Sequence, residues 1–349
     1  MATATGVYHT TYRAEMALRH SRAEYARLAL VVIALVAAPF FVHPFWLTVF
    51  NQIGIAAIGA IGLNILVGFT GQISLGQGGF LAVGAYTSGI LVARFDWPFF
   101  IAILAAVLMT AAVGAFFGLP ALRLKGLYLA IATLASQQII IWVVTHWDPV
   151  TGGVDSLVVP PAELFGVVLA GDFAFYWVTL AFAALAALAA SNMFRTGIGR
   201  AFIAIRDQDV AAELIGVDPV RFKVLAFAVS SGFVGLAGAL TAHYYLIVTW
   251  ERFTLDVSIL YLAMIIVGGL GSVSGSIYGA AFMIAVPAYI REISRTFSGS
   301  LEFVARELPA IQQLVFGLTI ILFLVFEPRG IARIWQRVKD YFRLWPFRY

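Results

Sequence analysis

Long apolar runs separated by short polar segments dominate the chain. A helix needs about 20 mainly apolar residues to cross the hydrocarbon core of a bilayer. Ten runs reach or approach that length; they cover residues 28–42, 53–69, 78–92, 99–119, 127–144, 173–190, 224–248, 257–270, 277–290 and 311–326. The pattern predicts an all-α integral membrane protein with about ten transmembrane helices.

The longest charged interval between two apolar runs covers residues 191–223. No Pro or Gly interrupts residues 200–215, and the Ala, Glu and Leu residues there favour one surface helix. Gly216 follows where a left-handed residue would end that helix. Asp218 and Pro219 fit the N-cap and the first turn of the next helix. The interval is therefore predicted to place a short helix in water between two spans, although a plain connecting loop stays possible.

Composition agrees with a membrane protein. Hydrophobic residues make up 62% of the chain and charged residues 11%, whereas soluble domains average roughly 45–50% and about 25%. The chain has no cysteine, which excludes disulfides and thiolate metal sites, and its five histidines are scattered without ligand spacing. We therefore expect no metal and no cofactor. We also expect no nucleic-acid partner, because the basic residues behind the net charge of +4 are placed by membrane orientation.

Basic residues are unevenly divided between the two sides of the predicted bundle. With ten spans and a cytoplasmic N-terminus, five of the 22 basic residues lie outside, namely Arg94, Arg252, Arg291, Arg295 and Arg306. The other 17 (22 − 5) lie in the cytoplasm, in agreement with the positive-inside rule. Both termini and the interval 191–223 are therefore expected to be cytoplasmic.

This topology divides the chain into a cytoplasmic segment 1–27, a transmembrane domain 28–326 and a cytoplasmic tail 327–349. The first apolar run lacks a signal-peptide cleavage pattern, so we expect it to be retained. Residues 146–172 form the longest external loop, which could dock a soluble partner or fold as a capping or re-entrant segment. In the tail, apolar residues recur at helical spacing among basic ones, which indicates an amphipathic helix on the membrane surface.

A glycine-rich stretch, residues 62–84, interrupts the second and third apolar runs. It contains seven glycines, and the uncharged polar side chains of Asn64, Gln72, Ser74 and Gln77 lie among them. Broken backbone at membrane depth is tolerated only inside protein or beside a water-filled cavity, and interrupted helices mark transport pathways. Close helix packing through small residues, with Asn and Gln bonding across helices, is the alternative.

A weak similarity links this stretch to a later one. Val267, Gly268, Gly271 and Ser274 lie 200 positions after Val67, Gly68, Gly71 and Ser74. Transporters often carry internal repeats, but matches of this kind in glycine-rich sequence also arise by chance. The similarity therefore carries little weight.

The apolar runs lack ionisable and catalytic groups, and this limits the functions that the protein could have. All 18 acidic residues fall in loops or at the ends of runs, whereas ionisable groups inside the membrane mark proton-coupled carriers. Paired carboxylates, a Ser–Lys dyad and a His cluster are also absent from the runs, which argues against an intramembrane enzyme.

A P-loop needs Lys before Ser or Thr, and the lysines here precede Gly126, Val224 and Asp340. If ATP drives transport, another chain hydrolyses it; a stand-alone channel and a sodium-coupled carrier stay open.

Several motifs together resemble a known family. They are GLNILVG at 62–68, GQISLGQG at 71–78, GLYLA at 126–130, TLA at 133–135, the loop 199–216, GGLGS at 268–272 and EPRG at 327–330. In this order they resemble the membrane permeases of branched-chain amino acid ABC importers, above all the M-type subunit of the high-affinity system. The resemblance covers about residues 50–335.

The resemblance implies an all-helical permease in the bacterial inner membrane that lacks catalytic activity of its own. Its partners would be a homologous second permease, two cytoplasmic ATP-binding subunits and a periplasmic or secreted substrate-binding protein. The spacing of Ala211, Ala212 and Gly216 is similar to the loop by which such permeases engage their ATPases. The implied ATPase-coupling residues are Arg200, Arg206, Asp207, Ala211, Ala212, Glu213 and Gly216.

The candidates for lining the substrate path are Asn64, Gln72, Ser74, Gln77 and Gln138. Because these side chains carry no charge, they favour a small neutral or zwitterionic solute. Branched-chain amino acids are expected first, with urea, amides or aromatic acids as alternatives, since fold resemblance does not settle the ligand. The chain departs from the family pattern at Gln138, where an acidic residue is frequent, and at Ser156, Trp250 and Ser276.

The predicted orientation can be tested by cysteine labelling, because the chain has no native cysteine. An impermeant thiol reagent added outside intact cells should label a cysteine at position 155 and leave one at position 207 unlabelled. Both should react after the membrane is permeabilised. The reverse pattern in intact cells would invert the topology and remove the cytoplasmic role of the interval 191–223.

Overall fold

The computed structural model describes residues 22–164, 167–169, 171–296, 308–327 and 330–344. Most of the predicted segment 1–27, together with Arg306, Arg329 and residues 345–349, lies outside this part of the chain. The elements in order are α2 (Arg22–Phe41), α3 (Pro44–Asn64), the π-helix η1 (Ile65–Phe69), α4 (Gln77–Phe95), α5 (Phe99–Ala121), α6 (Leu127–His146), α7 (Asp148–Thr151), β1 (Leu157–Val158), β2 (Glu163–Leu164), β3 (Val167–Val168), α8 (Asp172–Met193), α9 (Gly197–Asp207), α10 (Asp209–Leu214), α11 (Pro219–Tyr245), β4 (Ile247–Val248), the 3-10 helix η2 (Trp250–Phe253), α12 (Leu255–Gly268), α13 (Val273–Thr296), α15 (Leu308–Phe326) and α16 (Gly330–Leu344).

Each predicted apolar run coincides with a helix, so the all-α class is confirmed. Seven helices in the described chain are long and apolar enough to cross a membrane: α3 with η1, α4, α5, α6, α8, α11 and α13. The apolar parts of α2 and α15 are shorter, and α12 has 14 residues, or about 21 Å of helix. Ten crossings therefore stay a prediction that rests on these three helices.

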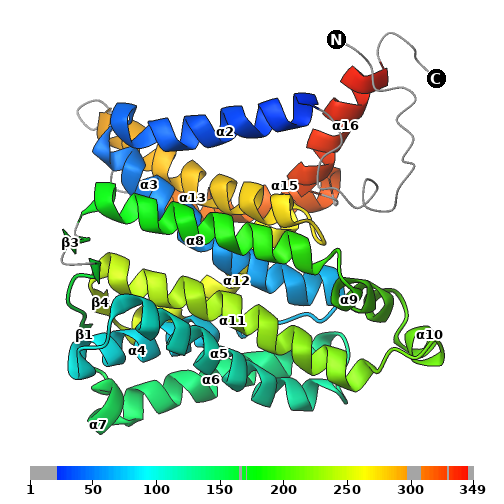
Figure 1. The fold of residues 1–349 in the computed structure, drawn as a ribbon, viewed down its shortest axis with the longest axis horizontal. Helices are drawn as coiled ribbons and strands as arrows, with labels where there is room; N and C mark the ends of the chain where they lie inside the picture. The colour runs from blue at the N-terminus through cyan, green and yellow to red at the C-terminus, as the bar shows by residue number, and fades with distance from the viewer. Residues whose placement is uncertain (1–21, 165–166, 170, 297–307, 328–329, 345–349) are drawn as a thin grey trace.

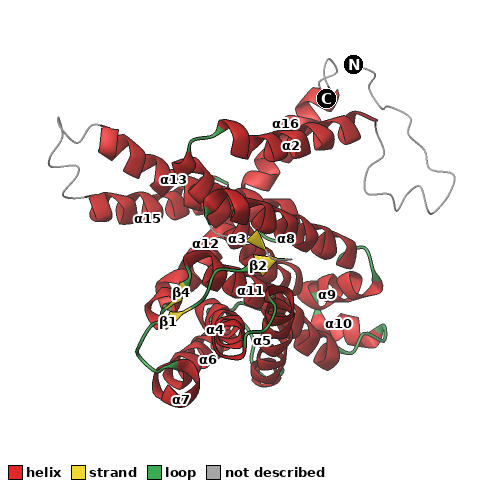
Figure 2. Ribbon diagram, turned by 60° about the vertical axis from the view of Figure 1, so that its left-hand side comes forward, coloured by secondary structure: helices red, strands yellow, loops and turns green. Residues whose placement is uncertain are grey.

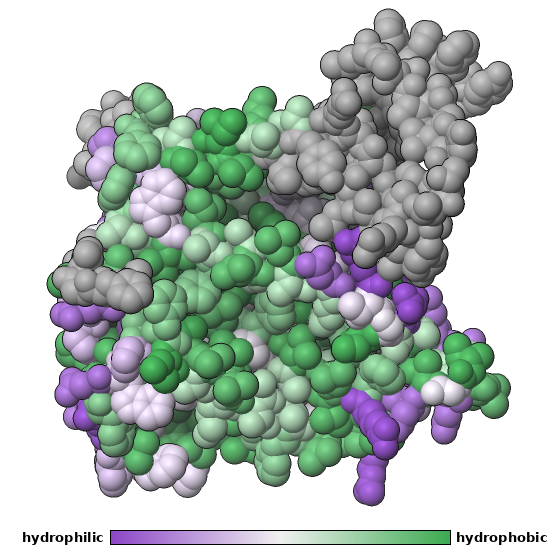
Figure 3. All heavy atoms as spheres, in the orientation of Figure 1, coloured by the Kyte–Doolittle hydropathy of each residue, from purple (hydrophilic) through white to green (hydrophobic). Residues whose placement is uncertain are grey.

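The long helices lie side by side along one direction, as Figure 1 shows, and Figure 2 looks nearly down α4 and α5. The space-filling view shows a broad hydrophobic surface over the middle of the helices, with hydrophilic groups toward the two ends (Figure 3). A bundle with an apolar belt and polar ends is the arrangement that a bilayer stabilises.

Helix α11 lies at the centre of the bundle, where it packs against α3, α4 and α5. Close approach depends on glycine: a Cβ on Gly84 of α4 would lie 2.6 Å from Cα of Gly235 on α11. One turn away, a Cβ on Gly238 would meet the backbone of Leu81. Small residues thus bring two helix backbones into contact, as is usual for helices that pack in membranes.

The glycine-rich stretch breaks the second and third predicted runs as expected. After η1 and Thr70, residues 71–76 have no regular secondary structure and return into the bundle. The amide N–H of Leu75 donates to Thr133 Oγ1 of α6, and Gln77 Nε2 donates to the carbonyl of Gly59, inside α3. Helix α4 therefore begins within the bundle and not at its end.

The two ends of the bundle differ. At one end, α7 and the four short strands cover the helices; β1 pairs antiparallel with β4, and β2 with β3. The capping interpretation of residues 146–172 therefore agrees with the structure. At the other end lie α9 and α10, with the start of α2 and helix α16 on the same side of the bundle (Figure 1).

The interval 191–223 departs from the prediction in one respect. The prediction of a single helix there is wrong, because the chain becomes extended at Gln208 and forms two helices, α9 and α10. Contacts of the neighbouring side chains with the bundle outweigh the helix propensity of the sequence. The two boundaries that follow are confirmed: Gly216 has φ of 90°, and the Asp218 carboxylate accepts the backbone N–H groups of Val220 and Arg221.

Candidate functional site

Asn64, the last residue of α3, holds the break between α12 and α13. Its buried amide Nδ2 donates to the carbonyl of Ser272 at 3.0 Å and to Ser276 Oγ at 2.7 Å. Its Oδ1 accepts the backbone N–H of Gly271 at 2.9 Å. We call the group formed by Asn64, Gly68 and residues 269–276 the glycine junction, because it joins the two broken helix pairs of the bundle.

Glycine is required on both sides of this junction. A Cβ on Gly68 would collide with the backbone nitrogen of Gly271 and with the Asn64 amide. Gly271 itself has φ of 72°, a conformation that side chains with a Cβ rarely adopt. The two glycine-rich stretches that lie 200 positions apart in the sequence are therefore in direct backbone contact.

Arg206 connects α9 to this junction. Its Nη1 donates to the carbonyl of Gly68 at 3.2 Å, and its Nε and Nη2 donate to Asp207 Oδ1 at 3.0 and 2.9 Å. A Cβ on Gly71 would lie 3.1 Å from Arg206 Cγ, so the arginine stem covers the break after η1. The carbonyl of Gly68 belongs to the end of a helix, where acceptors lack a partner in the next turn.

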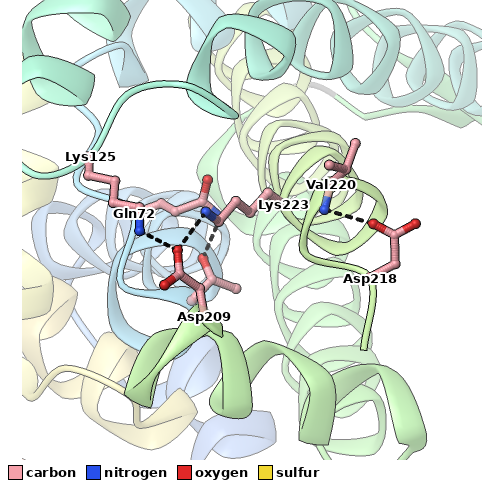
Figure 4. Close-up of polar contacts among 7 residues, drawn as sticks. Gln72, Lys125, Asp209, Asp218, Val220 and Lys223 are labelled. Atoms are coloured by element: carbon pink, nitrogen blue, oxygen red, sulfur yellow. Dashed lines mark hydrogen bonds and ion pairs between the residues drawn. The ribbon is translucent and has the colours of Figure 1, made fainter. Parts of the chain in front are cut away.

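A second connection joins α10 to the bundle through Asp209 (Figure 4). Its Oδ2 lies 2.5 Å from Lys125 Nζ in the α5–α6 loop and 3.3 Å from Lys223 Nζ at the start of α11. The hydrogen bond from Lys125, supported by Lys223, holds the pKa of the Asp209 carboxyl below its ordinary range. Asp209 is thus ionised at neutral pH and ties three elements together.

The remaining coupling candidates are exposed on this loop, with one exception. Arg200, Ala211 and Glu213 are exposed and Gly216 ends the loop, whereas Ala212 is buried. Apolar side chains also point outward here, and sequence reasoning did not single them out: Val210, Leu214 and Ile215 are 60%, 84% and 76% exposed. Grouped apolar side chains at a charged surface are typical of contact sites for other proteins.

The structure divides the five path candidates. Asn64, Gln72, Ser74 and Gln77 are buried along the broken stretch, whereas Gln138 is exposed on α6. The neighbouring Gln137 is the inward residue: its Nε2 donates to the carbonyl of Phe253 at 3.2 Å, and its Oε1 accepts the Ser258 hydroxyl at 2.7 Å.

Helical phase could have identified Gln137. The buried positions 133, 137, 140 and 144 of α6 follow the spacing i, i+4, i+7 and i+11, and position 138 falls outside it. Ser258 carried no such signal, because its role depends on where α12 begins. The backbone N–H of Gly78 donates to Ser258 Oγ at 2.8 Å, so the starts of α4 and α12 meet inside the bundle.

Comparison with known proteins gives consistent matches. Residues 45–324 match the family described as "Branched-chain amino acid transport system / permease component". The chain is 31% identical over 328 residues to "High-affinity branched-chain amino acid transport system permease protein LivM" of Salmonella typhimurium, covering 87% of this chain and 73% of that protein. The same figures hold for LivM of Escherichia coli K12. "Autoinducer 2 import system permease protein LsrC" of Salmonella typhi is 27% identical over 250 residues, 69% of each chain. No solved structure matches the chain.

The role of Asp209 in holding the loop can be measured by hydrogen exchange. Asp209→Asn keeps the size of the side chain and removes the charge that faces two lysines, so backbone amides of 209–214 should exchange severalfold faster. Asp207→Asn, the same change at a nearby residue that pairs with Arg206 alone, is the control and should leave 209–214 nearly unchanged. Equal exchange in the two variants would show that the lysine contacts do not restrain α10.

Proposed function

Because the chain belongs to the permease family of branched-chain amino acid transport systems, we propose that it is the permease subunit of an ATP-driven importer in the bacterial inner membrane. Its solutes are branched-chain amino acids, and its partners are a second permease, two cytoplasmic ATP-binding subunits and a substrate-binding protein outside the membrane. The chain itself is a transport subunit, and ATP is hydrolysed on the partner chains.

The observation that carries this proposal is the bond between the α9–α10 loop and the glycine junction. Force applied to the outer face of the α9–α10 loop reaches Gly68 through Arg206. It also reaches the α5–α6 loop, through Asp209. Both contacts end at or beside the backbone breaks, where a helical bundle is easiest to rearrange. Interrupted helices of this kind commonly form the substrate and ion sites of transporters.

The outer face of the loop fits an ATP-binding partner. Its exposed Val210, Leu214 and Ile215 offer an apolar contact, and Arg200 and Glu213 flank them with charge. The positive-inside rule favours a cytoplasmic position for this end of the bundle, on the side where ATP is available. Helix α16, with exposed Ile334 and Trp335 on an amphipathic helix, lies at the same end, as a surface-bound cytoplasmic tail should.

The path is proposed to run along the face of α6 that carries Gln138, between this subunit and the second permease. An uncharged amide there can hydrogen-bond a zwitterion during passage without trapping it. The buried Asn64, Gln72, Ser74 and Gln77 form the wall behind this face and change its shape when the junction moves. Urea, amides and aromatic acids are the alternative solutes on the same architecture.

The proposed function can be tested with the complete complex in proteoliposomes. Leucine uptake should require ATP on the side of the ATPases and the binding protein on the other side. The purified chain alone should hydrolyse no ATP and pass no leucine down a gradient. Leucine flux through this chain alone would favour a channel, and uptake that follows a sodium gradient without ATP would favour a sodium-coupled carrier.

The coupling role of the loop predicts a specific effect of Gly216→Val. Gly216 has φ of 90°, and the space that a Cβ would occupy there is open to at least 4 Å, so the substitution acts through backbone strain of about 1–3 kcal/mol. We expect ATP-dependent uptake to fall at least tenfold while the protein still inserts and assembles. Gly197→Val is the matched control, since Gly197 begins α9 without positive φ and also has open space around it. Unchanged uptake in Gly216→Val would reduce this turn to a connector.

A further inference from the structure

A cavity of about 360 Å³ lies between the α9–α10 loop and the bundle. Its walls come from the broken stretch, the α5–α6 loop, α6, α9, α10 and α11; they include Leu124, Lys125, Leu129, Ile205, Asp209 and Lys223. The volume falls in the range of roughly 300–1,000 Å³ that is usual for small-molecule sites. Figure 4 shows the charged side of this cavity.

The cavity has an excess of positive charge. Arg206 and Asp207 pair with each other, which leaves Asp209 as the carboxylate shared by Lys125 and Lys223. Both lysines contact Oδ2, and an ammonium group has three N–H donors. Each lysine therefore keeps donors and the group keeps one unbalanced positive charge, which suits a carboxylate ligand.

The same cavity offers an acceptor without a donor. Within the described chain, both lysines contact Oδ2 of Asp209, and no hydrogen bond or ion pair reaches its Oδ1. An ionised carboxylate accepts hydrogen bonds on both oxygens, so a ligand ammonium close to Oδ1 would supply the missing donor.

The remaining wall is aliphatic. Leu124, Leu129 and Ile205 line the cavity, and the last two are 3% and 6% exposed. An anion site, a free carboxylate oxygen and an apolar wall together match a zwitterionic amino acid with an aliphatic side chain. A phosphate or a simple carboxylate would leave the free oxygen and the apolar wall unused.

We propose that this cavity binds an aliphatic α-amino acid from the cytoplasmic side and that the bound molecule slows the transporter. The ligand carboxylate contacts Lys125 and Lys223, its ammonium contacts Asp209 Oδ1, and its side chain contacts Leu129 and Ile205. A ligand held this way bridges α10, the α5–α6 loop and α11, so it restrains the loop that must move. This feedback rests on the proposed function, since the transported solute is then its own inhibitor.

Binding is tested on the purified complex without the substrate-binding protein. Leucine should bind, whereas its methyl ester, which lacks the carboxylate, and 4-methylpentanoate, which lacks the ammonium, should bind at least tenfold more weakly. Lys125→Gln should weaken leucine binding about tenfold or more, because it removes a charged contact from a side chain that is 69% exposed and unimportant for packing. Arg221→Gln, at an exposed residue that pairs with Asp218 outside the cavity, is the control and should bind like the wild type.

Regulation is tested in proteoliposomes by placing leucine on the side of the ATPases. Relative to the uptake of the same variant without leucine, it should reduce ATP-driven uptake severalfold in the wild type and in Arg221→Gln, and much less in Lys125→Gln. Equal relative inhibition in Lys125→Gln and the wild type would overturn the cavity site and leave the proposed function standing. Equal binding of leucine and 4-methylpentanoate would overturn the amino-acid assignment, whereas absence of ATP-driven uptake in every variant would count against the proposed function instead.

Discussion

The structure depends on one constraint: backbone that leaves a helix inside a membrane must find its hydrogen bonds within the protein. Two broken helix pairs meet in this bundle, and the Asn64 amide supplies both a donor and an acceptor to the second break. Gly68 and Gly271 let the two breaks touch, which brings that amide within reach. A side chain without both functions would leave buried backbone groups unpaired at a cost of about 1–3 kcal/mol each.

The loop at the end of the bundle takes its shape from the same constraint. Gly68 presents a carbonyl that its own helix does not use, and Arg206 reaches it from α9. Asp209 turns toward the opposite wall to meet Lys125 and Lys223. One continuous helix could not direct these two side chains to such different partners, which accounts for the extended residue at Gln208.

Most of the fold could be predicted from the sequence because long apolar runs have one stable solution in a bilayer. The helix boundaries at Gly216 and Asp218 were also predictable, since positive φ and N-cap bonding are local properties. The split between α9 and α10 was not, because it depends on residues distant in the chain. Gln137 was missed for a different reason. The spacing of buried positions along α6 identifies it as an inward residue, but the prediction chose its neighbour Gln138, because Gln138 departs from the family pattern.

The geometry of the junction also bears on how the protein works. Its two glycine-rich stretches are in backbone contact and joined by hydrogen bonds from Asn64 and Arg206, each worth about 0.5–1.5 kcal/mol in net stability. Separating them costs several times the thermal energy of roughly 0.6 kcal/mol, so spontaneous opening is rare. Under the proposed function, the partner that displaces the α9–α10 loop supplies this energy, because Arg206 of α9 holds the carbonyl of Gly68 and moves with the loop.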